Sequence, residues 1–212
     1  MNITERKLVQ INVDVQNDFC PGGALAVPDG DKVTKPLNKL AYVVREEGGI
    51  VVATQDFHPE QTSHFDQWPV HCVAGTDGAD FHPDLSVVLG DRVIIKGTEP
   101  GEDAYSGFDG HDEDDPSLTL TKIIEQPGEV RDVSLFIGGL ATDYCVRATV
   151  LDALKLQKTV KNKLAVYALT DAMRAVNIEP TDGEKSLAEM EAAGAILTTT
   201  DEVIRRIRRG EL

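Results

Sequence analysis

The sequence predicts an α/β fold in which a parallel β-sheet is covered by helices on both faces. Short apolar runs rich in β-branched residues alternate along the chain with longer segments of helical periodicity. Most of these runs are apolar at nearly every position, which is typical of parallel strands that are buried on both faces. The length of 212 residues suits a full-sized core, so residues 1–212 are expected to form a single domain.

Six short runs are predicted to form the strands. Each combines valine, isoleucine or leucine with few charged residues and is flanked by polar or glycine-containing segments. In chain order the predicted strands are residues 9–15, 50–54, 93–96, 134–139, 164–169 and 195–198.

The segments between these strands show the periodicity of amphipathic helices. Leu37, Leu40 and Val44 fall on one face of the first helix, and Gly48 provides its end. The helix after the fourth strand is the clearest, with an apolar stripe along its length. The predicted helices are residues 32–47, 118–125, 142–156, 182–193 and 202–209.

Four polar residues fall at the ends of the predicted strands. Asp14 ends the first strand and Asp56 follows the second. Lys96 ends the third, and Cys145 lies just past the fourth. The carboxyl ends of parallel strands meet at one edge of a sheet, where ligands bind in such folds. We therefore expect these four side chains to converge on one site.

Three histidines and an aspartate crowd into the stretch TQDFHPEQTSHFDQWPVHC, as Asp56, His58, His64 and His71. Imidazole suits Zn, Fe and Ni, and a carboxylate broadens the choice of metal. The spacing of Asp56 and His58 allows a short turn to present both to one ion. The set predicts a site for one divalent transition metal, with Zn favoured and Fe or Mn also suitable. His82 is a weaker candidate ligand.

Cys145 follows a glycine-rich turn, GGLATDY, which places it in the first turn of a helix. The helix dipole and free N–H groups favour an anion there, so we expect the pKa of the thiol to be lowered. The backbone N–H groups of Ala141 and Cys145 could hold an oxyanion. The alternative is a small buried hydrophobe, the usual state of a free cysteine.

Asp14 and Lys96 are candidate partners of this thiol. An aspartate in an apolar strand is costly to bury unless it is paired or protonated, and at the strand end it could act as a general base. Lys96 could balance Asp14 and stabilise a thiolate. The alternatives are a turn residue for Asp14 and a solvated strand-end lysine for Lys96.

Aromatic residues are scarce, at 5% of the chain, so those close to the predicted site are informative. Phe19 and Trp68 could form walls for a flat aromatic substrate, with Tyr105 as a third wall. Ordinary packing is the alternative for each. Cys20 and Cys72 have no base beside them in sequence and are interpreted as structural or incidental.

The net charge and composition exclude some classes of binding partner and indicate a cellular location. A net charge of −15 argues against nucleic acid and anionic membranes, which require a cationic face. No secretory signal or membrane-spanning run is evident, and three cysteines do not suggest a disulfide framework, so a cytoplasmic location is expected. A homo-oligomer is compatible with the sequence. Residues 107–116 (GFDGHDEDDP) are expected to form a solvated acidic loop that includes His111.

Several segments resemble the nicotinamidase (pyrazinamidase) group of the isochorismatase-like cysteine hydrolases. The Asp-x-His, SHF and WPxHC blocks favour a metal-bearing member over metal-free relatives. The resembling segments are VDVQNDFCPGGAL (13–25), TQDFHP (54–59), SHF (63–65), WPVHCVAGT (68–76), VIIKG (93–97), YSGF (105–108), GGLATDYCVRATVLDAL (138–154) and, more weakly, LTDAMRAV (169–176).

The resemblance implies a three-layer α/β/α sandwich around a six-stranded parallel sheet. It implies an oxyanion hole at Ala141 and Cys145, with a cis peptide between Leu140 and Ala141. The implied catalytic triad is Asp14, Lys96 and Cys145, and the implied metal ligands are Asp56, His58, His64 and His71.

The activity implied by the resemblance is hydrolysis of nicotinamide to nicotinate and ammonia through a Cys145 thioester, a step of NAD salvage. The ring would lie between Phe19 and Trp68 with its nitrogen toward the metal, and pyrazinamide would also be accepted. Three alternatives stay open: another small amide as substrate, attack by a metal-bound water as in zinc amidohydrolases, and a non-catalytic binding protein with a structural metal.

Overall fold

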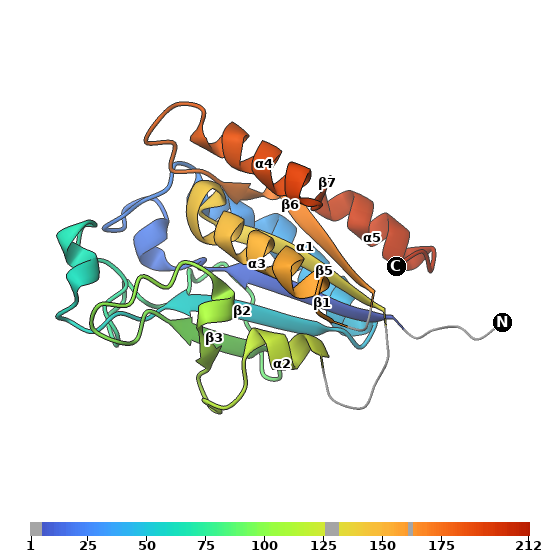
Figure 1. The fold of residues 1–212 in the computed structure, drawn as a ribbon, viewed down its shortest axis with the longest axis horizontal. Helices are drawn as coiled ribbons and strands as arrows, with labels where there is room; N and C mark the ends of the chain where they lie inside the picture. Colours follow the sequence, from blue (N-terminus) through green and yellow to red (C-terminus); the bar gives the residue numbers. More distant parts are fainter. Residues whose placement is uncertain (1–5, 126–131, 161–162) are drawn as a thin grey trace.

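A seven-stranded sheet runs through the middle of the protein (Figure 1). The computed structural model describes residues 6–125, 132–160 and 163–212. The strand order is β4-β3-β2-β1-β5-β6-β7; all neighbours pair in parallel except β3 and β4, which pair antiparallel. The strands are β1 (Lys7–Val13), β2 (Ile50–Asp56), β3 (Arg92–Lys96), β4 (His111–Asp112), β5 (Val133–Leu140), β6 (Leu164–Arg174) and β7 (Ile196–Thr198).

The six predicted strands are confirmed, but the predicted count is wrong by one because β4 adds a two-residue strand. This strand lies inside the segment expected to be a solvated acidic loop. Asp112 is buried, and its carboxylate accepts hydrogen bonds from the backbone N–H groups of Asp114 and Asp115 at 3.1 and 3.0 Å. These bonds allow an aspartate to pack at the sheet edge, and His111 is half-buried beside it.

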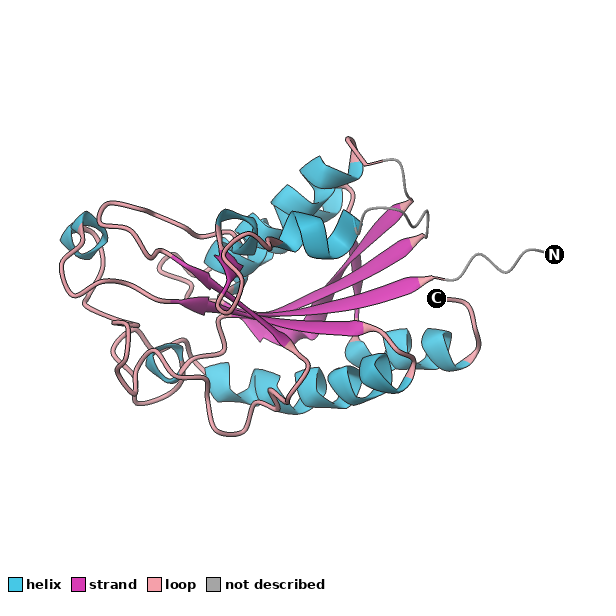
Figure 2. Cartoon of the chain, turned by 90° about the horizontal axis from the view of Figure 1, so that it is seen from below, coloured by secondary structure: helices cyan, strands magenta, loops and turns pink. Residues whose placement is uncertain are grey.

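Helices cover both faces of the sheet, as Figure 2 shows, so the three-layer prediction is confirmed. One face carries α1 and α5, and the other carries α2, α3 and α4. Among the described residues, no helix combines the length and apolar character required to span a bilayer. The helices are α1 (Thr34–Glu46), α2 (Leu120–Glu125), α3 (Arg147–Gln157), α4 (Asp182–Ala193) and α5 (Thr200–Arg208).

The alternation of side chains along β1 builds the two cores. Val9 and Ile11 point into the core beneath α2, α3 and α4, whereas Leu8 packs on the side of α1 and α5. Gln10 points to this second side, where its amide donates to the carbonyl oxygen of Leu37 at 3.0 Å. Burial of β1 on both faces explains why its sequence is apolar at nearly every position.

The predicted helix at residues 142–156 divides into two parts. A π-helical turn, η5 (Thr142–Val146), comes first, and α3 follows from Arg147. Such turns are frequent at functional sites. The division places Cys145 in the wider turn next to the carboxyl end of β5.

Candidate active site

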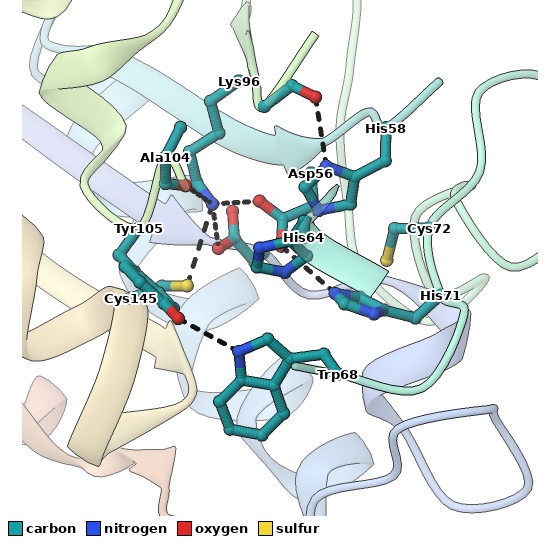
Figure 3. Close-up of polar contacts among 12 residues, drawn as sticks. Asp56, His58, His64, Trp68, His71, Cys72, Lys96, Ala104, Tyr105 and Cys145 are labelled. Atoms are coloured by element: carbon teal, nitrogen blue, oxygen red, sulfur yellow. Dashed lines mark hydrogen bonds and ion pairs between the residues drawn. The ribbon is translucent and has the colours of Figure 1, made fainter. Parts of the chain in front are cut away.

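Polar residues from distant parts of the chain converge at the carboxyl edge of the sheet, as predicted. Asp14 follows β1, Asp56 is the last residue of β2 and Lys96 is the last residue of β3. Cys145 lies beyond β5, the neighbour of β1 in the sheet. Figure 3 shows Lys96 pointing between Asp56 and Cys145, with the three imidazoles on the far side of Asp56.

Lys96 lies at the centre of the buried charges. Its Nζ is 2.9 Å from Asp14 Oδ2 and 3.7 Å from Cys145 Sγ, and it also pairs with Asp56 and donates to the carbonyl oxygen of Ala104 at 3.0 Å. Burial alone would lower the pKa of Lys96, but the carboxylates of Asp14 and Asp56 hold it well above its ordinary value. The solvated-lysine alternative is therefore wrong. Asp14, Asp56 and Cys145 lie close enough together to bind a metal ion, but the Lys96 ammonium group contacts all three. Its positive charge takes the place that a metal ion would otherwise occupy among these three side chains.

Asp14 is held in a fixed orientation. Its φ of +47° takes the chain out of extended geometry, which explains why β1 ends at Val13 rather than at residue 15 as predicted. Thr54 Oγ1 donates to Asp14 Oδ1 at 2.5 Å. Burial raises the pKa of Asp14 against the attraction of Lys96. A carboxyl group with a raised pKa is suited to accept and return a proton near neutral pH.

The Cys145 thiol is buried and lines a cavity. Burial raises its pKa well above the ordinary value; Lys96 opposes this shift, while the carboxylates of Asp14 and Asp56 add to it. The prediction of a lowered pKa is therefore wrong, because it considered the helix start and not the burial or the two carboxylates. A resting thiol of this kind requires a base to become a nucleophile. Asp14 is the candidate, because its carboxylate hydrogen-bonds to the Cys145 side chain.

The turn before Cys145 has the shape that the family resemblance implies. The peptide bond between Leu140 and Ala141 is cis, and Ala141 lines the same cavity as Cys145. Gly139 has a φ of +129°, and a Cβ there would lie 2.0 Å from the carbonyl oxygen of Val13. Only glycine can therefore bring this turn so close to the end of β1.

The three histidines of the predicted metal site lie together, with one ring nitrogen of each within 4.8 Å of the others. The Nδ1 atoms are held by other groups: His58 by the carbonyl oxygen of Gly97 at 3.0 Å, and His71 by that of Pro69 at 2.7 Å. His64 Nδ1 lies 2.6 Å from a carboxylate oxygen of Asp103. If each Nδ1 carries the proton in these bonds, each Nε2 is left as a ligand atom.

These residues fit a divalent metal ion. His58 Nε2 is buried and has no hydrogen-bond partner among the described residues, which is costly unless a cation completes the site. Asp56 Oδ2 lies 3.8 Å from His58 Nε2 and 4.0 Å from His71 Nε2, so the carboxylate borders the same space. Burial lowers the pKa of His58 to about 4 and also lowers that of His71, which keeps both imidazoles neutral, as metal binding requires.

Aromatic side chains line the cavity above these groups. Phe19, Trp68 and Tyr105, the predicted walls, all border it. Trp68 Nε1 donates to Tyr105 Oη at 3.0 Å, and Phe19 packs against His71 with ring centroids 5.4 Å apart. The predicted walls are therefore next to both the thiol and the imidazoles.

Tyr144 and Asp143 are among the residues at the site that the sequence did not predict. Tyr144 lines the cavity and packs edge-on against Trp68, with ring centroids 5.1 Å apart. Its position next to Cys145 in a chain with few aromatic residues was a usable signal. The carboxylate of Asp143 accepts from the backbone N–H groups of Val176 and Asn177 at 2.9 and 2.8 Å. This link spans 33 residues, and no sequence pattern indicates it.

The remaining candidates lie outside this group. His82 accepts a hydrogen bond from the backbone N–H of Asp84 at 3.2 Å and is not part of the imidazole cluster. Cys20 and Cys72 are buried free thiols, consistent with a structural role. Burial raises the pKa of Cys20 to about 11 and that of Cys72 further, as it does for Cys145. Unlike Cys145, neither thiol lines the cavity, so neither is placed to attack a molecule bound there.

Comparison with known proteins agrees with this geometry. The model of the Isochorismatase domain matches residues 9–202. The nicotinamidase of Escherichia coli (strain K12) is 38% identical over 206 residues, which cover 88% of this chain and 92% of that protein. The nicotinamidase/pyrazinamidase of Mycobacterium tuberculosis (strain ATCC 25618 / H37Rv) is 40% identical over 194 residues, covering 88% of this chain and 96% of that protein.

A solved structure extends the match to three dimensions. The crystal structure of the pyrazinamidase of Pyrococcus horikoshii in complex with zinc superposes with a TM-score of 0.76 at 40% identity, covering 91% of this chain and 99% of that chain. Sequence and structure thus agree over nearly the whole length, and the chain belongs to the isochorismatase family.

Proposed function

We propose that this protein is a nicotinamidase, which hydrolyses nicotinamide to nicotinate and ammonia and also accepts pyrazinamide. One observation carries the proposal: Cys145, with Lys96 beside it, and three imidazoles border a single cavity with aromatic walls. A cysteine nucleophile and a metal centre on one small apolar cavity suit a flat heteroaromatic amide. The similarity to the E. coli and M. tuberculosis enzymes supports this reaction.

The substrate ring would lie between Phe19 and Trp68, with Tyr105 as a third wall. Asp56, His58, His64 and His71 would hold one divalent metal ion, which supplies a Lewis acid toward the pyridine nitrogen when bound. We propose zinc, because imidazole and carboxylate ligands suit it and the related Pyrococcus pyrazinamidase was solved with zinc.

In the first half of the reaction, Asp14 accepts the proton of the Cys145 thiol as the sulfur attacks the amide carbon. The backbone N–H groups of Ala141 and Cys145 hold the negative charge on the former carbonyl oxygen. Asp14 then gives the proton to the amide nitrogen, the C–N bond breaks and ammonia leaves. The acyl group remains on Cys145 as a thioester, while Lys96 keeps the buried charges balanced.

In the second half, water attacks the thioester carbon. Asp14 accepts a proton from this water and returns one to the sulfur as the C–S bond breaks and nicotinate is released. The raised pKa of Asp14 suits it to both directions of proton transfer.

Ammonia release from nicotinamide tests the proposal. Wild-type protein loaded with zinc, a chelated sample and Cys145→Ala are compared, with bound zinc measured in each. We expect turnover by the loaded wild type, strong loss on chelation and near-total loss in Cys145→Ala at unchanged zinc content. Absence of turnover by loaded wild type would overturn the nicotinamidase assignment. Substantial activity of Cys145→Ala would instead favour attack by a metal-bound water.

A further inference from the structure

The segment 103–106 runs between the metal site and the catalytic triad. Each of its first three residues contacts a different part of the site. Asp103 pairs with His64, the carbonyl oxygen of Ala104 accepts from Lys96 at 3.0 Å, and Tyr105 Oη accepts from Trp68 at 3.0 Å. The contact of Asp103 has no role in the reaction described above.

The partner of His64 differs from those of the other two imidazoles. His58 and His71 are paired with backbone carbonyl oxygens, of Gly97 and Pro69. His64 is paired with a side-chain carboxylate, with its Nδ1 2.6 Å from Asp103 Oδ1. A carboxylate that accepts the proton of a ligand histidine fixes the tautomer and the ring direction, and it increases the basicity of the ligand nitrogen.

The backbone around this pair is also connected. His64 lies in the short helix η3 (Ser63–Asp66), and its N–H donates to Thr62 Oγ1 at 3.2 Å. The N–H of Gly101 donates to the same hydroxyl at 3.3 Å. The loop that carries Asp103 is thus joined to the loop that carries His64 at two points. The His64 side chain is only 6% exposed, whereas that of Asp103 is 46% exposed, so the pair reaches from the buried site to its rim.

We propose that Asp103 is a positioning residue of the metal site, whose carboxylate holds His64 with Nε2 toward the metal and strengthens metal binding. This inference rests on the proposed function, since it requires a metal ion held by the three histidines. Outer partners of this kind change metal affinity by about 10- to 100-fold. The effect belongs to His64 alone, because the partners of His58 and His71 are part of the backbone.

Zinc affinity, measured by competition with a chromophoric chelator, tests the proposal in the purified chain. Asp103→Ala removes the carboxylate, and Asp103→Asn keeps an acceptor oxygen but removes the charge. Asp66→Asn is the matched control, since Asp66 is exposed, lies close to His64 in η3, and contacts none of the three imidazoles in the described part of the chain. We expect about 10- to 100-fold weaker zinc binding in Asp103→Ala, a smaller loss in Asp103→Asn, and a change of less than about twofold in Asp66→Asn.

A second measurement distinguishes loss of the His64 contact from a wider disturbance of residues 103–106 by the Asp103→Ala substitution. The rate of Cys145 alkylation in the metal-free protein reports on the triad, which Ala104 contacts through Lys96. It should be the same in Asp103→Ala and wild type. Wild-type zinc affinity in Asp103→Ala, an equal loss in Asp66→Asn, or a changed alkylation rate in Asp103→Ala would each overturn the proposal.

The same experiments distinguish this inference from the proposed function. If the wild type binds no zinc, the metal site and the role of Asp103 are both wrong. If it binds zinc but releases no ammonia from nicotinamide, the proposed reaction is wrong, and the zinc titrations still decide the role of Asp103.

Discussion

The half of the site that holds the proposed triad (Asp14, Lys96 and Cys145; the triad half) and the half that holds three imidazoles (His58, His64 and His71; the metal half) are built by different means. The triad residues lie at strand ends or in the turn after β5, and the Lys96 ammonium is paired with buried carboxylates. The histidines lie beyond β2, His64 in the short helix η3 and His58 and His71 in loops, and their directions depend on hydrogen bonds to each Nδ1.

The two halves differ in whether they can form without a metal ion. The triad half is balanced by its own charges, whereas the metal half leaves His58 Nε2 buried without a partner among the described residues. Asp56 joins the two halves, with Oδ1 on Lys96 and Oδ2 facing the imidazoles. We therefore expect mutations in the triad half to act on chemistry and folding, and changes in the metal half to act through metal binding and pH.

The largest effect is expected from Cys145→Ala, which should lower ammonia release by about 10⁴-fold or more, since loss of a nucleophile removes the covalent route. Zinc stoichiometry should stay unchanged because Cys145 contacts none of the three imidazoles in the described structure. Loss of zinc together with activity would show that the two halves are not separable. Cys20→Ala, at a buried thiol outside the cavity, is the matched control.

Lys96→Met should have the next largest effect, a loss of about 3–5 kcal/mol in the free energy of unfolding of the metal-free protein. The substitution leaves the buried carboxylates of Asp14 and Asp56 without their cation. Urea unfolding measures the change. The double variant Lys96→Met/Asp14→Asn should recover part of it, because one uncompensated charge is removed. Equal stability of the single variant and the wild type would contradict the charge-balanced triad.

Acid should destabilise the metal half of the metal-free protein. His58 has a pKa of about 4 in the folded protein against an ordinary value of 6.5. Between these values the unfolded chain binds a proton that the folded chain does not, so stability falls as pH falls from about 6.5 to about 4. The contribution of His58 is roughly 3 kcal/mol.

Urea unfolding at a series of pH values, on chelated protein, measures this effect. His58→Gln should flatten the dependence between pH 6.5 and 4, and His82→Gln, outside the cluster, should not. His71 contributes in the same direction, because burial lowers its pKa too. If the free energy of unfolding of His58→Gln depends on pH as steeply as that of the wild type, His58 is not the cause of the acid sensitivity.

The smallest of these effects is expected from Asp143→Asn. The asparagine keeps one acceptor oxygen for two backbone N–H groups, which should cost about 1–3 kcal/mol of stability. Because Val176 lines the cavity, KM for nicotinamide should rise while zinc affinity stays the same. Asp152→Asn, which removes an exposed pairing with Lys155, is the control and should change stability by less than about 1 kcal/mol. A loss of zinc affinity in Asp143→Asn would show that this carboxylate also supports the metal half, and would contradict a role confined to the segment at Val176 and Asn177.

Local sequence determined most of the architecture. Strands such as β1 and β5 are buried on both faces, so the apolar runs in their sequences predict them without tertiary information. The crowding of His58, His64 and His71, and the positions of Asp14, Lys96 and Cys145 at strand ends, likewise predicted that they would meet. β4 was missed because a two-residue strand has no periodicity of its own.

The electrostatics and the long-range hydrogen bonds of the site depend on the complete fold and could not be predicted from local sequence. The pKa of Cys145 is raised because burial and two carboxylates outweigh Lys96, and burial is a property of the whole fold. The pairing of Asp103 with His64 joins residues 39 apart, and that of Asp143 with Val176 joins residues 33 apart. Such bonds depend on loops from different strands being brought to one edge. Local sequence patterns therefore predict which groups meet at the site, whereas the pKa values of these groups, the directions of their side chains and their hydrogen-bond partners follow from the folded chain.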